Sequence, residues 1–485
     1  MGKLQKSTYF CGMNYEAVIG LEIHIQLNTQ SKVFCGDALR FGDVPNSHTS
    51  PVGLGMPGSL PVLNVAAIEK AMVLGLALGC TINKYNEFVR KHYFYPDLPK
   101  GYQITQGAHP ICLGGGLQNE NFQVEIHHIH LEEDAGKSLH DQHDFFSYID
   151  LNRAGTPLLE LVTEPCIKSA EEAHWFLSEI RRLVRWLGVS DGNLEAGSLR
   201  CDANVSVRVA GEKMLGNKVE IKNLNSLRSV KRAIEGEIVR QTALKNDDTP
   251  ILQQTRGYDA KKNTTYALRD KEAAQDYRYF ADPDLPPHCI TQKEIDEVAS
   301  KLPELPQAWQ KRLVADFHLS EFDAALLTEN IETATYYQQI TAHTEQHKMA
   351  ANWLLGSIKA HLNAQNIGIS ELGIAPEKIA ALLNLVADGR ISQGIATQKI
   401  LAHLYQNPEA DILEISGSLG SVETENVADL GVLIAEILAS YPEKVAEYRK
   451  GKKGLMGLFV GELMKKTGGK ADAKLATEGF VAGLK

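Results

Sequence analysis

The chain has 485 residues, of which 44% are hydrophobic and 23% charged, and its formal net charge is −10. This composition predicts a globular chain of several domains, and no apolar stretch approaches the roughly 20 residues that a membrane-spanning helix needs. The 7 cysteines never form a Cys-x-x-Cys pair, and residues 1–14 carry neither a secretory signal nor an arginine-rich transit peptide. We therefore expect reduced thiols, a cytoplasmic location and no membrane segment.

The first predicted strand, residues 18–27, places two candidate metal ligands on one face. Hydrophobic and polar residues alternate along it, so Leu21 and Ile23 point one way while Glu22 and His24 point the other. Glu22 and His24 are therefore expected to share a polar face of the sheet.

Acidic residues recur in three later strands. Residues 124–134 form an apolar strand that ends in three consecutive acids just before a glycine turn, namely Glu132, Glu133 and Asp134. The same alternation places Asp202 on the polar face of residues 201–209 and Glu220 on that of residues 219–222. Several strands are thus expected to bring carboxylates to one surface.

One inserted helix has clear boundaries. Ser169 is expected to cap its first turn, and Glu172 three residues later completes a capping box. The apolar residues then recur with helical spacing until Gly188, which supplies the left-handed residue that ends the helix. We expect this helix to pack against the sheet and to carry no chemistry.

The clustered acids suggest a metal site. If the strands are neighbours, the carboxylates repel one another unless a cation lies among them, and oxygen ligands with an occasional imidazole suit Mg²⁺ or Mn²⁺. The functional interpretation is a hard metal at a phosphate-binding site. An antiparallel sheet with one solvated face produces the same alternation, and the pattern alone leaves both interpretations open.

A nucleotide would need a site other than a P-loop, because no Gly-x-x-x-x-Gly-Lys-Ser/Thr run is present. Arginines in a turn-rich stretch are candidates for bidentate contacts to triphosphate oxygens: Arg256, Arg269 and Arg278. Taken singly, each arginine more commonly makes a surface salt bridge.

The hydrophobic period changes near residue 295. Strand-like runs with a few helices predict an α+β region before it, and a 3.6-residue period predicts an all-α region after it. A turn signal at Asn407-Pro408 marks a small last module. We expect domains over residues 1–295, 296–409 and 410–485. The excess of basic residues after Tyr448 indicates either a surface for a polyanion or an ordinary solvated helical face.

Eight runs in a fixed order carry a family resemblance. The runs are Val18-IGLEIHIQL, Gly55-MPGSLPVLN, Lys91-HYFYPDLPKGYQIT, Ile129-HLEEDAGK, Asp150-LNRAGTPLLELVTEP, Gly197-SLRCDANVSVR, Glu220-IKNLNS and Asp276-YRYF. Over nearly the whole chain they closely resemble the B subunits of Glu-tRNA(Gln)/Asp-tRNA(Asn) amidotransferases.

This resemblance implies an N-terminal antiparallel-sheet cradle of the glutamine synthetase and guanido-kinase type, a helical domain and a small YqeY-like tail. It also implies a ligase that uses ATP and Mg²⁺ to phosphorylate the side-chain carboxylate of Glu-tRNA(Gln), Asp-tRNA(Asn) or both. Phosphorylation turns a poor leaving group into a good one, and ammonia then displaces the phosphate.

The resemblance carries over residue by residue at the metal site. Glu22 and His24 match the family's Glu-x-His metal motif, and Glu133 matches the metal-binding acid of the His-x-Glu-Glu-Asp run. Asp202 and Glu220 stand in matched runs and are expected in the metal and ATP site. Arg256 and Arg278 are expected to contact ATP.

Two lysines flank the Tyr-Phe-Tyr-Pro-Asp run. Lys91 and Lys100 are expected to stabilise the acyl phosphate or to line a path for ammonia. For Lys91 a structural ion pair with Asp97 is an equal alternative.

The chain departs from the family at four positions where many members carry zinc-binding cysteines. These zinc-equivalent positions are Cys35, Asp37, Ser50 and Gly53. Since zinc needs four donors, or three and a water, and glycine has no donor, we expect no structural zinc. His48 is a possible donor in a polar loop, where a lone histidine is more often simply exposed.

The expected partners are the amidase (glutaminase) and the small third protein of a heterotrimer, together with the mischarged tRNA, which the helical and tail domains are expected to bind. A non-catalytic tRNA scaffold is one rival function. A self-sufficient glutaminase is another, but the chain lacks the Ser-Ser-Lys amidase signature. Co-location of Glu22, His24 and Glu133 in a cleft would favour the enzyme over the scaffold.

Overall fold

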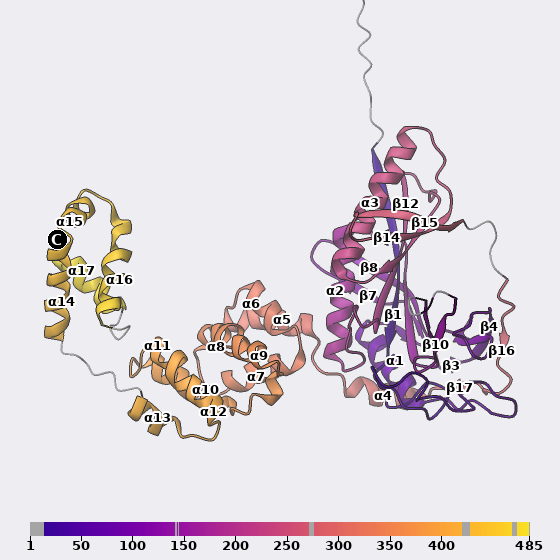
Figure 1. Cartoon of the computed structure of the whole chain (residues 1–485), viewed down its shortest axis with the longest axis horizontal. Coiled ribbons are helices and arrows are strands. Elements are labelled where there is room, and N and C mark those ends of the chain that lie inside the picture. The colour runs from indigo at the N-terminus through magenta and orange to yellow at the C-terminus, as the bar shows by residue number, and fades with distance from the viewer. Residues whose placement is uncertain are drawn as a thin grey trace, which may run out of the picture. The chain divides into compact units, whose positions relative to one another are not determined.

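The computed structural model describes residues 14–140, 143, 145–270, 276–419, 427–467 and 473–484. The chain divides into two compact units, Met1–Pro306 and Gln307–Lys485 (Figure 1). Within the described residues, no helix is long and apolar enough to span a membrane.

A twisted sheet forms the body of the first unit. Among the described residues it has 13 strands, and its main path is β15-β14-β13-β12-β1-β11-β8-β5-β4-β16. The strands of this path are β1 (Tyr15–Gln26), β4 (Phe88–His92), β5 (Tyr102–Gln106), β8 (Gln123–Glu133), β11 (Pro157–Thr163), β12 (Leu199–Val209), β13 (Val219–Leu224), β14 (Gln254–Asp259), β15 (Thr264–Asp270) and β16 (Phe280–Ala281).

Shorter strands lie beside this path. Three of them extend the main sheet: β6 (Cys112–Leu113) and β7 (Gly116–Gln118) pair with β8, and β2 (Thr81–Ile82) pairs with β6. Two separate ribbons pair β9 (Lys137–Leu139) with β10 (Tyr148–Asp150), and β3 (Tyr85–Asn86) with β17 (His288–Cys289).

The sheet is mixed, whereas the sequence predicted an antiparallel one. β13 and β14 pair in parallel. Helix α3 (Leu227–Asn246) connects these two strands, because parallel neighbours need a crossover rather than a hairpin.

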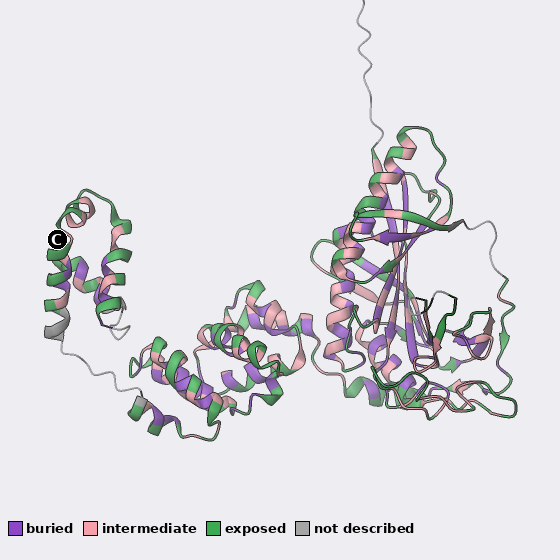
Figure 2. Ribbon diagram, in the orientation of Figure 1, coloured by how far each residue is buried: buried purple, intermediate pink, exposed green. Residues whose placement is uncertain are grey.

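Helices cover one face of the sheet. They are α1 (Val65–Ala77), α2 (Ala170–Trp186) and α3, and α4 (Gln292–Ser300) packs on α1. Buried residues, purple in Figure 2, are concentrated on the central strands, and with the buried residues of these helices they form one hydrophobic core. Ile19, Leu21, Ile23 and Ile25 of β1 are completely buried in this core, so the alternate residues of β1 must face the other side.

Helix α2 confirms its predicted boundaries. The Ser169 hydroxyl accepts the backbone N–H of Glu172 at 3.1 Å, and Gly188 has a φ of 61°. Glu172 accepts the N–H of Lys168 rather than that of Ser169, so the expected capping box is displaced by one residue.

The regular elements described in the second unit are all helices. Its α-helices are α5 (Pro306–Phe317), α6 (Glu321–Leu327), α7 (Ile331–Thr341), α8 (His347–Trp353), α9 (Lys359–Gln365), α10 (Pro376–Ala387), α11 (Gln393–Ile395), α12 (Leu401–Gln406), α13 (Ile412–Leu419), α14 (Val427–Ser440), α15 (Pro442–Arg449), α16 (Met456–Lys466) and α17 (Ala473–Leu484). The π-helical segments η1 (Leu354–Ile358) and η3 (Ala396–Ile400) and the 3₁₀ turns η2 (Ile369–Glu371) and η4 (Lys453–Leu455) complete it.

Two predicted boundaries fall inside packed structure. Residue 295 lies within α4, where Ile295 and Val298 belong to the core of the first unit. Residue 410 lies just before α13, which packs against α10 and η3. A separate core is made by α14, α16 and α17, and among the described side chains it includes Ile434, Phe459 and Phe480.

Candidate active site

The polar face of β1 carries the candidate site. Glu22, His24 and Gln26 alternate with the buried residues of the strand, as the sequence predicted. β1 lies between β11 and β12, and its register places His24 opposite Glu160 of β11 and Glu22 opposite Asp202 of β12. Neighbouring strands thus bring acids to one surface.

His24, Glu132 and Glu160 form the first group of possible ligands, called the histidine cluster here. Their ligating atoms lie within 4.8 Å of one another. His24 Nε2 is 3.2 Å from Glu160 Oε2, and His130 Nε2 lies 3.4 Å from Glu132 and 3.6 Å from Glu160. Three strands, β1, β8 and β11, supply this cluster.

Glu22, Asp202 and Glu220 form a second group, the carboxylate cluster, again with ligating atoms within 4.8 Å. Lys222 Nζ lies 2.6 Å from Asp202 and 3.0 Å from Glu220, so an ammonium offsets part of the negative charge. Asn204 also donates to Glu22 Oε1 at 2.8 Å.

The electrostatics of the two clusters differ. Burial raises the pKa of Glu22, and the nearby charge of Glu160 raises it further, so a proton or cation is favoured there. Burial opposes ionisation of Glu160, but the hydrogen bond from His24 and the charge of His130 hold the pKa of that carboxyl well below its usual range. Burial also disfavours imidazolium at His24, yet Glu160 raises its pKa overall.

The structure places Glu133 away from Glu22 and His24, so the expected co-location of these three residues does not hold. Leu131 and Glu133 point to the core side of β8, whereas Glu132 points to the polar face, because side chains alternate along a strand. Glu132 therefore takes the position that was predicted for Glu133.

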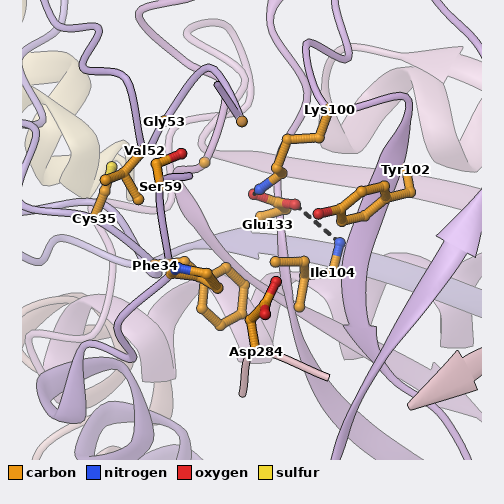
Figure 3. Close-up of a pocket in the computed structure, with 13 residues that line it drawn as sticks. Phe34, Cys35, Val52, Gly53, Ser59, Lys100, Tyr102, Ile104, Glu133 and Asp284 are labelled. Carbon is orange, nitrogen blue, oxygen red and sulfur yellow. Dashed lines mark hydrogen bonds and ion pairs between the residues drawn. The ribbon is translucent and has the colours of Figure 1, made fainter. Parts of the chain in front are cut away.

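Glu133 instead lines a small cavity of about 60 Å³ (Figure 3). Its carboxylate accepts hydrogen bonds from Lys100 Nζ at 2.5 Å and from the Ile104 N–H at 2.9 Å. Glu133 is 2% exposed, and Cys35 lines the same cavity. Lys100 is thereby the partner of a buried carboxylate.

Lys91 lies near the histidine cluster. Its charge contributes to the low pKa of Glu160, and its Nζ lies 5.0 Å from the ring centre of Tyr277 and 5.6 Å from that of Tyr93. Within the described part of the chain, Lys91 makes no ion pair with Asp97, which accepts from the Ser138 hydroxyl at 3.2 Å.

Of the arginines expected to contact ATP, Arg256 points to the opposite face. Arg256 lies opposite Ile221, donates to the Thr265 hydroxyl at 2.9 Å, and approaches the buried Glu237 of α3 at 3.7 Å. Arg278 is 83% exposed beside Asp276. The side chain of Arg269 lies outside the described residues.

The zinc-equivalent positions lie close together. The Asp37 carboxylate accepts the Ser50 N–H at 2.9 Å, and a Cβ on Gly53 would lie 2.6 Å from Asp37 Oδ2 and 3.5 Å from Cys35 Sγ. His48 bonds to Asp43 at 2.7 Å. The hydrogen bond that Asp37 accepts from Ser50 thus links two of the zinc-equivalent positions.

A cavity of about 1250 Å³ opens beside the polar face. Its walls mix acids and bases, including His24, Asp202, Lys222, Arg153 and Arg200. Such a volume accommodates a nucleotide-sized ligand.

Glu132 and Glu160 were not predicted as site residues. Both stand within runs that carried the resemblance, and the alternation from Ile129 and Leu131 would have placed Glu132 on the polar face. Glu160 required knowledge of the pairing between β1 and β11, which only the fold supplies.

Two oxygen-rich clusters beside a large cavity are typical of metal-dependent enzymes that act on phosphorylated substrates. Residues 17–296 match the family model of the GatB/GatE catalytic domain, and residues 335–482 match that of the GatB domain. The chain is 45% identical to the B subunit of the aspartyl/glutamyl-tRNA(Asn/Gln) amidotransferase of Janthinobacterium sp., over 96% of this chain and 98% of the relative.

Two further relatives carry the same name. The protein of Chlorobium luteolum is 43% identical and that of Nitrosococcus oceani 45% identical, each over 96% of this chain and 98% of the relative. The chain therefore belongs to the family of aspartyl/glutamyl-tRNA(Asn/Gln) amidotransferase B subunits, as the sequence predicted.

Proposed function

We propose that this chain activates the side-chain carboxylate of Glu-tRNA(Gln), Asp-tRNA(Asn) or both, as the B subunit of a tRNA-dependent amidotransferase. This enzyme is a ligase that forms a carbon–nitrogen bond and gives Gln-tRNA(Gln) or Asn-tRNA(Asn) for translation. Family membership supports the reaction. The observation that carries the activating role is the pair of ligand clusters on one sheet face beside the large cavity.

The residues present fit Mg²⁺. His24, Glu132 and Glu160 would hold one ion, and Glu22, Asp202 and Glu220 a second, because hard cations prefer carboxylate oxygens. The raised pKa of Glu22 supports this fit, since a cation would relieve the repulsion from Glu160, Glu220 and Asp202. Bound magnesium would neutralise charge on the phosphates of ATP and orient them.

The chain's own residues contribute fixed charge around the phosphates. Lys91, close to the histidine cluster, would stabilise the phosphorylated carboxylate. Lys222 would offset part of the negative charge of the carboxylate cluster. Attack of the carboxylate on the γ-phosphate forms an acyl phosphate and releases ADP. Ammonia then displaces phosphate, and the nitrogen loses a proton as the amide forms.

The remaining assignments extend the proposal. A partner amidase (glutaminase) would supply ammonia from glutamine, and Lys100 and Glu133, which line the small cavity, are assigned to the path of ammonia. A small third protein makes the complex a heterotrimer. The N-terminal cradle is assigned to the glutamine synthetase and guanido-kinase type of fold. The helical domain, residues 296–409, and the YqeY-like tail, residues 410–485, are assigned to tRNA binding. The complex is assigned to the cytoplasm.

An isotope experiment tests the activating role. The assembled complex receives Glu-tRNA(Gln) or Asp-tRNA(Asn) whose side-chain carboxylate carries ¹⁸O, together with ATP, Mg²⁺ and glutamine. Activation through an acyl phosphate transfers one ¹⁸O atom to inorganic phosphate for each amide formed. Amidation without ¹⁸O in the phosphate would refute the mechanism. A chain that is only a scaffold would keep ATP-dependent amidation when the residues of the two ligand clusters are substituted.

A further inference from the structure

Beyond the histidine cluster, the polar face carries a group of charges that the ligand clusters do not include. Asp134 follows β8, is 5% exposed, and accepts hydrogen bonds from Gln26 at 2.7 Å and from Arg200 Nη2 at 2.9 Å. Arg153 Nε lies 3.7 Å from the same carboxylate. One buried acid thus faces two guanidinium groups, which leaves an excess positive charge.

Both arginines are held in place and line the large cavity. Arg153 donates to the carbonyl oxygens of Ala135 at 3.0 Å and Gly136 at 2.6 Å. Within the described part of the chain, the buried Nε of Arg200 has no acceptor within hydrogen-bonding distance. The Arg153 and Arg200 side chains are each 38% exposed, so part of each guanidinium is open to an anionic ligand, which would offset the free-energy cost of unpaired donors.

The position of this group relates it to the reaction. Arg200 lies opposite His24 in the register of β1 and β12, and Gln26 follows His24 on the same face, about 7 Å further along the strand. The carboxylate cluster lies on the other side of His24, at Glu22. Arg200 thus lies beside His24 of the histidine cluster and two residues from Asp202 of the carboxylate cluster on β12. An anion held at Arg200 would therefore lie beside phosphates held at either cluster.

From this geometry we infer that Arg200 and Arg153 bind the side-chain carboxylate of the aminoacyl ester, and that Asp134 and Gln26 position Arg200. The inference rests on the proposed function and adds the substrate-recognition residues. Guanidinium pairs with carboxylate through two parallel hydrogen bonds, a geometry that a neutral amide cannot match. The same site would thereby favour the acid substrate over the amide product.

The test compares Arg200→Ala with the wild-type chain in the assembled complex. Affinities for Glu-tRNA(Gln) and Gln-tRNA(Gln) are measured without ATP, and KM and kcat are measured for Glu-tRNA(Gln) and ATP. We expect Arg200→Ala to weaken binding of the acid-charged tRNA by about 10- to 100-fold and to leave the amide-charged tRNA unchanged. Free guanidinium or ethylguanidinium should restore part of the lost activity.

Arg208→Ala is the matched control. Arg208 lies on the same strand but pairs with Glu16 at 2.5 Å, far from the two clusters, and its loss should change neither affinity. Arg200→Lys keeps the positive charge but cannot make two parallel hydrogen bonds to a carboxylate. It tests the inference if the alanine variant does not fold. Asp134→Asn should raise KM for the acid-charged tRNA more than it lowers kcat, which a purely structural role would not produce.

Three results would overturn the inference. If Arg200→Ala and Arg200→Lys discriminate between acid- and amide-charged tRNA as well as the wild type does, Arg200 does not recognise the carboxylate. Equal weakening of both tRNAs would assign Arg200 to the RNA backbone, and a raised KM for ATP alone would assign it to the nucleotide. Each result leaves the ¹⁸O transfer of the wild-type complex intact, whereas failure of the proposed function would abolish that transfer.

Discussion

Adjacent glutamates on β8 provide the sharpest test of the metal site. Glu132 points to the polar face within 4.8 Å of the other ligand atoms in the histidine cluster, while Glu133 points into the core and pairs with Lys100. We expect Glu132→Gln to raise the magnesium requirement of amidation and to leave stability nearly unchanged. Glu133→Gln should lower stability and leave the magnesium requirement unchanged.

The magnitudes follow from charge and burial. A pair of unit charges about 4 Å apart attracts by about 4 kcal/mol at an effective dielectric constant of about 20. The amide oxygen of glutamine and the lower desolvation cost offset part of this loss, so we take a net loss of about 3 kcal/mol, which corresponds to about 100-fold more Mg²⁺ for half-maximal activity. In Glu133→Gln, Lys100 loses its counter-charge where it is 10% exposed, which costs about 1–3 kcal/mol of unfolding free energy.

The assay titrates Mg²⁺ against ATP-dependent amidation by the assembled complex, and thermal unfolding is followed on the same samples. Each glutamate variant serves as the control for the other, because the substitution is identical and the residues are adjacent. A magnesium requirement raised in Glu133→Gln but not in Glu132→Gln would refute the assignment by strand alternation and restore Glu133 as the ligand.

Three further perturbations have distinct expected outcomes. Glu22→Gln or His24→Ala should remove ATP-dependent amidation while glutamine hydrolysis by the partner survives at least in part, and normal amidation of both variants at saturating Mg²⁺ would exclude these ligands. Elemental analysis should find no stoichiometric zinc, and mild chelation should leave the chain folded; one tightly bound zinc per chain would contradict this. Deleting residues from about 410 onward should weaken tRNA binding and flatten its salt dependence, with glutamine hydrolysis unchanged.

The sequence predicted those features that depend on local periodicity. The alternation along β1 placed Glu22 and His24 correctly on one face, and the caps of α2 marked its ends. Asp202 and Glu220 were also placed correctly on a shared polar face. Each of them alternates with apolar residues along its own strand, and these apolar residues define the buried face. These features need no knowledge of which strands are neighbours.

Features that depend on pairing or on the opposite face were not predictable in this way. Glu160 becomes a site residue only because β11 pairs with β1. Arg256 was expected at ATP, but the parallel pairing of β13 and β14 turns Thr255 toward Glu220 and Arg256 toward α3. Shifting the assumed alternation by one residue moves every side chain of the strand to the other face of the sheet, and amino-acid composition does not determine this alternation.

The position of the tail core decides how the tRNA prediction is best tested. α13 packs with the helical region, so a truncation at 410 also removes part of that packing, and lower affinity alone would not distinguish docking from destabilisation. Some basic residues of the tail are already engaged: Arg449 donates to the Leu484 carbonyl and Lys466 pairs with Glu436.

Exposed lysines on the surface of this core offer a cleaner perturbation, namely Lys450, Lys453 and Lys465. RNA helices are recognised largely through their shape and backbone, so changing all three lysines to alanine should flatten the slope of log affinity against log salt by about 2 to 3 if each contacts one phosphate. Because these side chains lie outside the buried core of α14, α16 and α17, the melting temperature should stay nearly constant. An unchanged slope in a folded triple variant would refute docking through this surface and leave the tail a packing element.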